Sequence, residues 1–267
     1  MTSPRTLPAP APHPAAPGPV SVLLGDADAR RTAVVLSPVM PHWDSGAFIE
    51  QVAGAFLGTG HRVLVHDTVS LLREGDDLAR LTERWADVLR RGGPVDVLVG
   101  NALGGAVVQG LLDRPWTHGS DVVVLSGPTV ADHELNTKLE SIARAVDEQG
   151  LAEAVRLKDE LVLGTARPAG PPAPYDGTAP DTARAAFRLA AGMRLLHDVD
   201  LADRVRAFPG RLLHVYGAES RLVRRAHLAA AAHHRCVEVP DAGMRPHSDR
   251  PELTRALLTR FLEEEGT

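Results

Sequence analysis

The chain has 267 residues and a formal net charge of −5; 44% of its residues are hydrophobic and 24% are charged. This composition is ordinary for a globular protein, and no apolar stretch approaches the length that crosses a bilayer, which excludes a membrane span. There is no basic stripe, so nucleic acid is not an expected partner. The single cysteine, Cys236, excludes an internal disulfide and predicts a cytoplasmic location.

Residues 1–19 are rich in proline and alanine and are predicted to form a disordered or polyproline-like tail. From Val20 onward, short apolar runs alternate with longer amphipathic segments. Strands are expected at Val20–Leu24, Thr32–Leu36, His61–His66, Val95–Val99 and Asp121–Leu125. Helices are expected at Gly46–Leu57, Leu78–Leu89 and Leu103–Leu112. The alternation predicts an α/β fold, with a mostly parallel sheet covered by helices on both faces.

The alternation stops near Val130 and resumes at Arg211. The interval contains helical patterns and a proline-rich stretch at 167–180; the helices are expected at Leu135–Val146, Leu151–Leu163 and Asp181–Leu196. We therefore predict a helical cap at 130–201, inserted between two parts of one core, 20–129 and 202–267. In the last part, strands are expected at Arg211–Tyr216 and Cys236–Val239, and helices at Leu222–Ala232 and Pro251–Glu264.

The most informative segment runs from a buried strand through Gly100-Asn101-Ala102-Leu103-Gly104-Gly105 directly into a helix. In the nucleophile elbow Gly-x-Ser-x-Gly, the central residue sits on a strained strand-to-helix turn between two small residues. Gly100 and Gly104 occupy the flanking positions. The central residue is Ala102, which has no hydroxyl and therefore cannot act as a nucleophile.

With this elbow, the order of elements and the cap position, the chain resembles the alpha/beta-hydrolase superfamily from about Val20 to its C-terminus. The resemblance extends to the closing segment VEVPDAGMRPHSDRPELTRALLTRFL, where Met244 stands at the position of the catalytic histidine. The acid of the family follows the preceding strand, and here that position is Ser220. The resemblance thus implies a degenerate triad of Ala102, Ser220 and Met244, which cannot perform serine hydrolysis.

The resemblance also implies that an oxyanion hole survives. In this fold its donors are the N–H after the nucleophile position and one from the first strand–helix loop, which here are Leu103 and Val39. Pro38 has no N–H, but the donor assigned to Val39 remains. Such a donor pair at a helix N-terminus polarises a carbonyl or binds an enolate.

Polar and aromatic residues around this cavity are the candidates for chemistry and binding. The predicted catalytic residues are His42, Asn101 and His247. The predicted substrate-binding residues are Val39, Trp43, Asp44, Ala102, Leu103, Glu219, Ser220 and Met244. Structural interpretations stay open: His42 and Asp44 as an exposed loop that caps the next helix, Trp43 as a cover of the core, and His247 as a histidine at a helix start. Asn101 could equally bond nearby backbone.

No cofactor or metal is predicted. Gly100–Gly105 lacks the glycine spacing of dinucleotide sites and the Gly-Lys-Ser/Thr ending of a phosphate loop. His233, His234 and Cys236 are near one another in sequence but lack the recurrent spacing of metal ligands.

Three functions remain open at this stage. The first is a non-hydrolytic enzyme, of the cyclase, isomerase or lyase type, that acts on a hydrophobic natural-product intermediate. The second is a non-catalytic protein that binds a small molecule or a partner. The third is a cryptic hydrolase in which Glu219 or His247 activates water directly. The expected partner is a small hydrophobic molecule, and homo-oligomer formation is left open.

Overall fold

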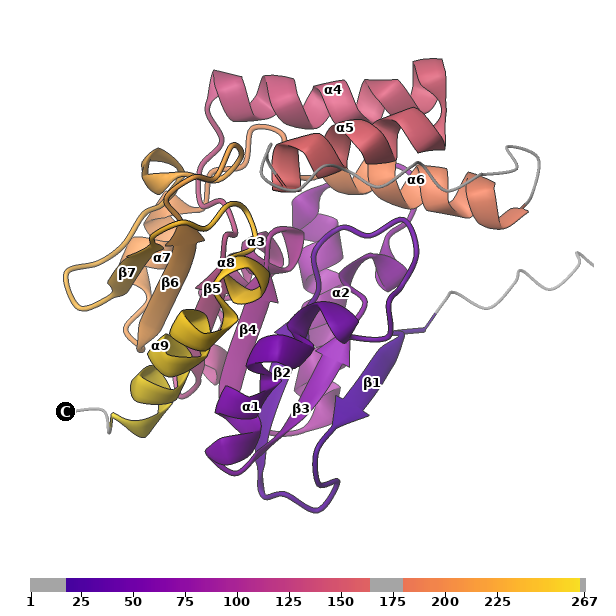
Figure 1. Ribbon diagram of the computed structural model, residues 1–267. Helices are drawn as coiled ribbons and strands as arrows, with labels where there is room; N and C mark the ends of the chain where they lie inside the picture. Colours follow the sequence, from indigo (N-terminus) through magenta and orange to yellow (C-terminus); the bar gives the residue numbers. More distant parts are fainter. Residues whose placement is uncertain (1–17, 164–179, 265–267) are drawn as a thin grey trace, which may run out of the picture.

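A seven-stranded sheet forms the centre of the protein in a computed structural model that describes residues 18–163 and 180–264 (Figure 1). The strands are β1 Ser21–Leu24, β2 Arg31–Leu36, β3 His61–His66, β4 Val97–Asn101, β5 Asp121–Leu125, β6 Leu212–Gly217 and β7 Arg235–Val239. Their order in the sheet is β1-β3-β2-β4-β5-β6-β7, and β1 pairs antiparallel with β3 while every other pairing is parallel. The prediction of a mostly parallel sheet is confirmed. The predicted tail lies mainly outside the described residues, and so does most of the proline-rich stretch.

Helices cover both faces of the sheet, because alternate side chains of each strand point to opposite faces. Val34 and Leu36 belong to one apolar cluster, together with residues of the helices α2 and α3. Ala33 and Val35 belong to a second cluster, which includes residues of α1 and α9. The helices are α1 Glu50–Gly58, α2 Leu78–Gly92, α3 Leu103–Gly110, α4 His133–Gln149, α5 Leu151–Leu163, α6 Pro180–Arg194, α7 Ala202–Ala207, α8 Pro246–Asp249 and α9 Pro251–Glu263.

Three helices between β5 and β6, namely α4, α5 and α6, pack on one another and lie together above the sheet in Figure 1. Apolar residues of α4 and α6, such as Leu139 and Leu189, belong to the same buried cluster as Leu36 of β2 and Leu103 of α3. These helices therefore rest on the core. The predicted boundaries of the cap, at residues 130 and 201, stay a prediction. Within the described ranges, no helix is both long and apolar enough to cross a membrane.

The predicted helix Leu222–Ala232 is wrong; only a single 3-10 turn, Arg225–His227, forms there. The alanine-rich pattern favours a helix, but tertiary contacts take up the groups that a helix would need. The Nδ1 atom of His227 accepts a hydrogen bond from the N–H of Arg224. The carbonyl of His227 accepts from the N–H groups of Thr129 and Val130. Burial of Leu228 and Ala229 completes this irregular packing.

Glycines allow the close approach of α3 to the sheet. A Cβ at Gly104 would collide with the carbonyl oxygen of Leu36, and a Cβ at Gly105 would lie 2.9 Å from the Cα of Gly127. Both obstacles are backbone atoms, which cannot rotate away. The position of the first turn of α3, and hence of the β4–α3 elbow, depends on these missing side chains.

We expect Gly104→Ala to destabilise the fold by about 2 kcal/mol or more, because the new methyl group must displace the backbone of β2. Gly58→Ala is the matched control: this glycine is also helical, and a Cβ there meets nothing within 4 Å. That change should be neutral or stabilising by up to about 1 kcal/mol. Urea unfolding followed by circular dichroism measures both. Equal effects of the two changes would contradict the close-packing argument.

Candidate functional site

The elbow between β4 and α3 keeps a strained backbone although its central residue is alanine. Ala102 has φ 49° and ψ −110°, a conformation that a residue with a Cβ rarely adopts. Its N–H donates to the carbonyl of Leu125 at 3.0 Å, and its carbonyl accepts from the N–H of Ala106 at 3.1 Å. These bonds hold the turn in place. Leu103 is the first residue of α3, so its N–H has no acceptor within the helix and faces the N-terminal end.

Ser220 and Met244 come from distant parts of the chain and lie side by side. The Oγ of Ser220 is 3.6 Å from the Sδ of Met244, and both side chains are buried. Gly217, at the end of β6, makes this approach feasible, because a Cβ there would collide with the carbonyl oxygens of Ala242 and Gly243. Neither side chain ionises in the accessible pH range, so the pair cannot act as an acid–base couple.

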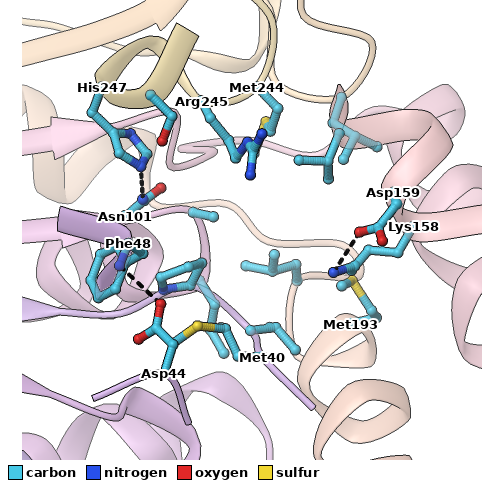
Figure 2. Close-up of a pocket in the computed structure, with 18 of the residues that line it drawn as sticks. Met40, Asp44, Phe48, Asn101, Lys158, Asp159, Met193, Met244, Arg245 and His247 are labelled. Atoms are coloured by element: carbon cyan, nitrogen blue, oxygen red, sulfur yellow. Dashed lines mark hydrogen bonds and ion pairs between the residues drawn. The ribbon is translucent and has the colours of Figure 1, made fainter. Parts of the chain in front are cut away.

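A second polar pair, Asn101 and His247, lies beside the elbow (Figure 2). The Nδ2 of Asn101 lies 3.2 Å from the Nε2 of His247, and both residues are buried. Burial, and secondarily the charge of Arg245, lowers the pKa of His247 to about 3, so its imidazole is neutral at pH 7. With Nε2 accepting from Asn101, the proton is on Nδ1, which has no hydrogen-bond partner among the described residues. The ring of Phe48 meets that of His247 edge-on, with centroids 6.4 Å apart.

The loop after β2 is fastened from above by Arg188 of α6. The Nε of Arg188 donates to the carbonyls of Met40 and Pro41 at 3.1 and 3.0 Å. Its two terminal nitrogens bind both carboxylate oxygens of Asp67 at 2.8 and 2.9 Å. This ion pair is buried, with side-chain exposures of 7% and 2%. It therefore fixes the loop that carries Val39 relative to the helices above it.

These elements enclose a cavity of about 470 Å³ (Figure 2). Its lining is largely apolar, from Val39, Met40, Ala47, Phe48, Leu103, Leu139, Val162, Met193, Leu196, Leu222 and Met244. The polar and charged side chains of the lining are Asp44, Gln51, Asn101, Lys158, Asp159, Arg245, His247 and Ser248. A space of this size, apolar with a few convergent polar groups, is typical of a small-molecule site.

Several predicted site residues meet at this cavity: Val39, Asp44, Asn101, Ala102, Leu103, Met244 and His247. Asp44 also caps the turn that follows it, accepting from the N–H groups of Gly46 and Phe48 at 2.9 Å. The predicted cap role and the cavity position are therefore compatible.

Four predicted site residues do not line the cavity. His42 is exposed on the loop, and Trp43 packs its ring against Phe48 with centroids 6.5 Å apart. Glu219 is exposed, with its N–H bound to the carbonyl of Ala242. Ser220 is buried behind Met244. The prediction that these four side chains surround the cavity is therefore corrected. Each is close in sequence to a residue of the lining, but closeness in sequence does not fix the direction of a side chain.

Sequence reasoning missed Arg245, Lys158, Asp159 and Met193. Arg245 lies between two residues that had been singled out, so its position next to Met244 was a usable signal. The other three are on α5 and α6, and only the packing of these helices brings them to the cavity. Among the residues that the structure describes, no group of three or more His, Cys, Asp or Glu side chains could hold a metal ion.

Comparison with known proteins gives a clear result for the fold only. No family model matches the chain, and no curated protein matches it by sequence. An alpha/beta-hydrolase enzyme from a Medee basin deep-sea metagenome library superposes with a TM-score of 0.74 at 14% identity, over 93% of this chain and 95% of that one. The enol-lactonase of Burkholderia xenovorans LB400 superposes with a TM-score of 0.71 at 17% identity, over 95% and 100% of the two chains. A bromoperoxidase from Bacillus anthracis superposes with a TM-score of 0.69 at 16% identity, over 91% of this chain and 95% of that one.

The chain has the alpha/beta-hydrolase fold. The seven-stranded sheet order, with its single antiparallel edge strand, and the β4–α3 elbow are in accord with this conclusion. At identities below one fifth the likeness concerns the fold alone, so the activity must be argued from the cavity itself.

The buried pair Arg188–Asp67 generates a prediction about stability. We expect Arg188→Met to destabilise the fold by about 3–5 kcal/mol, because it leaves the carboxylate of Asp67 buried without a partner. The double change Arg188→Met with Asp67→Leu should recover a large part of that loss, since no buried charge remains. Arg194→Met on the same helix, which breaks an exposed ion pair with Asp147, should cost about 1 kcal/mol or less. Urea unfolding compares the four proteins, and a double variant as unstable as Arg188→Met would contradict this account.

Proposed function

We propose that the protein is a non-hydrolytic enzyme of the alpha/beta-hydrolase fold, a cyclase, isomerase or lyase that acts on a hydrophobic small molecule of natural-product type in the cytoplasm. The observation that carries the proposal is the buried Asn101–His247 pair at a cavity whose elbow residue is Ala102. The cavity retains a polar pair that includes an imidazole, but it has no nucleophile at the bend.

The loss of serine hydrolysis follows from three positions. We interpret Ala102, Ser220 and Met244 as the remains of a catalytic triad. The contact between Ser220 and Met244 supports this assignment, because the acid and the base of a triad must also touch. Acyl transfer needs a nucleophile and a base that holds its proton, and a methyl group and a thioether supply neither.

The remaining groups suit reactions without a covalent intermediate. The N–H of Leu103 at the start of α3, together with that of Val39, would polarise a substrate carbonyl. The neutral imidazole of His247 would then donate or accept a proton on the substrate, with Asn101 fixing its tautomer. Ring closure, double-bond migration and elimination need only this polarisation and proton transfer in a water-poor site.

The apolar lining supports a hydrophobic substrate. Side chains from the interval predicted as the cap, among them Leu139, Val162 and Met193, contribute to the lining opposite the elbow. Apolar walls offer no hydrogen bonds, so the shape of the substrate and its few polar groups would decide its orientation.

A non-catalytic binding function is the second candidate, and the low pKa of His247 favours it. An imidazole with a pKa of about 3 is a weak base, whereas binding alone needs no base. A cryptic hydrolase that activates water through Glu219 or His247 is less well supported, because Glu219 is exposed and outside the cavity and an imidazole with a pKa of about 3 is a weak base for activating water.

The proposed loss of the triad predicts how activity could be restored. Ala102→Ser alone should not hydrolyse p-nitrophenyl butyrate above the buffer rate, since base and acid are still absent. Ala102→Ser with Ser220→Asp and Met244→His should be at least about 100-fold more active, because positions 220 and 244 are already in contact. Absorbance at the p-nitrophenolate band measures both. Esterase activity in the single variant would show that another residue serves as the base.

The proposed chemistry predicts which metabolites change. In the source strain, His247→Gln should lower the amount of the enzyme's product at least about tenfold, and the precursor should accumulate. Deletion of the gene should have the same effect. The precursor should have the elemental composition of the product, or of the product plus one small eliminated molecule. Untargeted mass spectrometry makes the comparison, with His197→Gln, a surface histidine, as the control.

Two outcomes would contradict the proposal of a non-hydrolytic enzyme. If the accumulated compound yields the missing product by cleavage with water, the protein is a hydrolase. If neither the deletion nor His247→Gln accumulates a precursor, the protein is a binder. Purified His247→Gln should unfold at a temperature close to that of the wild type, which separates loss of function from loss of folding.

A further inference from the structure

Arg245 places in the cavity a guanidinium that pairs with no described residue. Its guanidinium projects into the open space between the Asn101–His247 pair and the Lys158–Asp159 pair (Figure 2). It donates no hydrogen bond to, and forms no ion pair with, any residue in the ranges that the structure describes, and its Nε atom is buried. A guanidinium has five N–H donors, and burying one without an acceptor is unfavourable.

The carboxylates closest to Arg245 in the sequence are engaged elsewhere. Asp249, four residues on, accepts from the N–H of Gly243 at 2.9 Å. Asp241 pairs with Arg250 at 2.6 Å. The backbone of Arg245 is itself held, because its carbonyl accepts from the N–H groups of Ser248 and Asp249 at 2.8 Å. The backbone of Arg245 is therefore fixed at the cavity wall, while its guanidinium has no acceptor among the described residues.

The other charged side chains of the cavity lining already have partners. Lys158 and Asp159 form an ion pair of 2.8 Å, and the carboxylate of Asp44 accepts two backbone N–H groups. His247 is neutral at pH 7. The formal charges of the lining therefore sum to zero, but of its four charged side chains only Arg245 has neither a hydrogen bond nor an ion pair in the described ranges.

We propose that the ligand of this cavity is an amphipathic carboxylic acid, whose carboxylate binds the guanidinium of Arg245 and whose apolar body fills the space between the elbow and helices α4 to α6. A guanidinium matches a carboxylate with two parallel hydrogen bonds. One unpartnered guanidinium suits one carboxylate, whereas a phosphate dianion would need a second free cation, and Lys158 is already paired. This proposal deepens the proposed function, on which it rests for the chemistry that follows binding.

Binding of such an acid would also act on His247. Arg245 contributes, after burial, to the low pKa of this imidazole. A carboxylate on Arg245 offsets the guanidinium charge and moves the pKa of His247 back toward its ordinary value. The substrate would therefore make His247 a better base at the moment when it is bound.

A binding experiment with a matched pair of probes tests the substrate class. Decanoate and decanamide have the same chain length and differ in charge, and isothermal titration calorimetry at pH 7.5 measures both without any turnover. Wild-type protein should bind decanoate at least about tenfold more tightly than decanamide, as a charge-assisted bidentate pair would give. Arg245→Gln should abolish that preference, and Arg245→Lys should restore part of it. Arg250→Gln, an arginine outside the cavity, should leave it unchanged.

The outcomes that overturn the proposal are distinct. They are equal affinity for the two probes in the wild type, an undiminished preference in Arg245→Gln, no measurable binding of decanoate, and tighter binding of decyl phosphate than of decanoate. Unchanged thermal unfolding of Arg245→Gln shows that the variant is folded. Failure here would remove the carboxylic acid as the substrate class and leave the metabolite result for His247→Gln standing. A preference for decanoate with no metabolite change would instead leave a binding protein for acids.

Discussion

The cavity depends on one buried guanidinium. Arg188 joins three parts of the chain that are far apart in sequence: helix α6, which carries it, the carboxylate of Asp67 after β3, and the carbonyls of Met40 and Pro41 after β2. A buried ion pair of this kind contributes little to net stability, because desolvation offsets the attraction, but breaking it leaves a charge without a partner. Its consequence is geometric. The helices above the sheet and the loop that carries Val39 cannot move apart without exposing that charge, so both walls of the cavity have a fixed separation.

The elbow imposes the second constraint. Ala102 retains a strained backbone, and the glycines around it retain contacts that no side chain would permit. The position of this turn is over-determined by the packing of α3 on β2 and β5, so it persists whatever side chain is at its tip. What the turn supplies is therefore the backbone itself: the N–H of Leu103 and the N-terminal end of α3, both directed at the cavity.

The charged and titratable side chains of the cavity connect binding to chemistry. Burial keeps His247 neutral and Arg245 lowers its pKa further, so the cavity lining combines a weak base with an unpartnered guanidinium. An anionic group on the ligand would act on both, because it satisfies the guanidinium and removes the smaller of the two causes that lower the pKa of His247. Under our proposals, one electrostatic contact selects the substrate and activates the residue that acts on it.

The sequence by itself determined the order of strands and helices, the elbow at Gly100–Gly104 and the absence of a hydroxyl at Ala102. These features are local: alternating apolar runs, glycines at a fixed spacing and the identity of one residue can be read without knowing what packs against them. It also indicated His247 and Asn101 as site residues, through their places near the elbow and in the closing segment.

The wrong predictions have a common origin in long-range contacts. Leu222–Ala232 has a helical pattern, but contacts with Thr129 and Val130 prevent the helix from forming. Glu219 and His42 are next to site positions in sequence yet point elsewhere, and Arg245, Lys158 and Arg188 gain their roles only when α5, α6 and the closing segment meet. Side-chain direction and charge pairing are set by neighbours distant in the chain, and for that reason only the tertiary structure decided them.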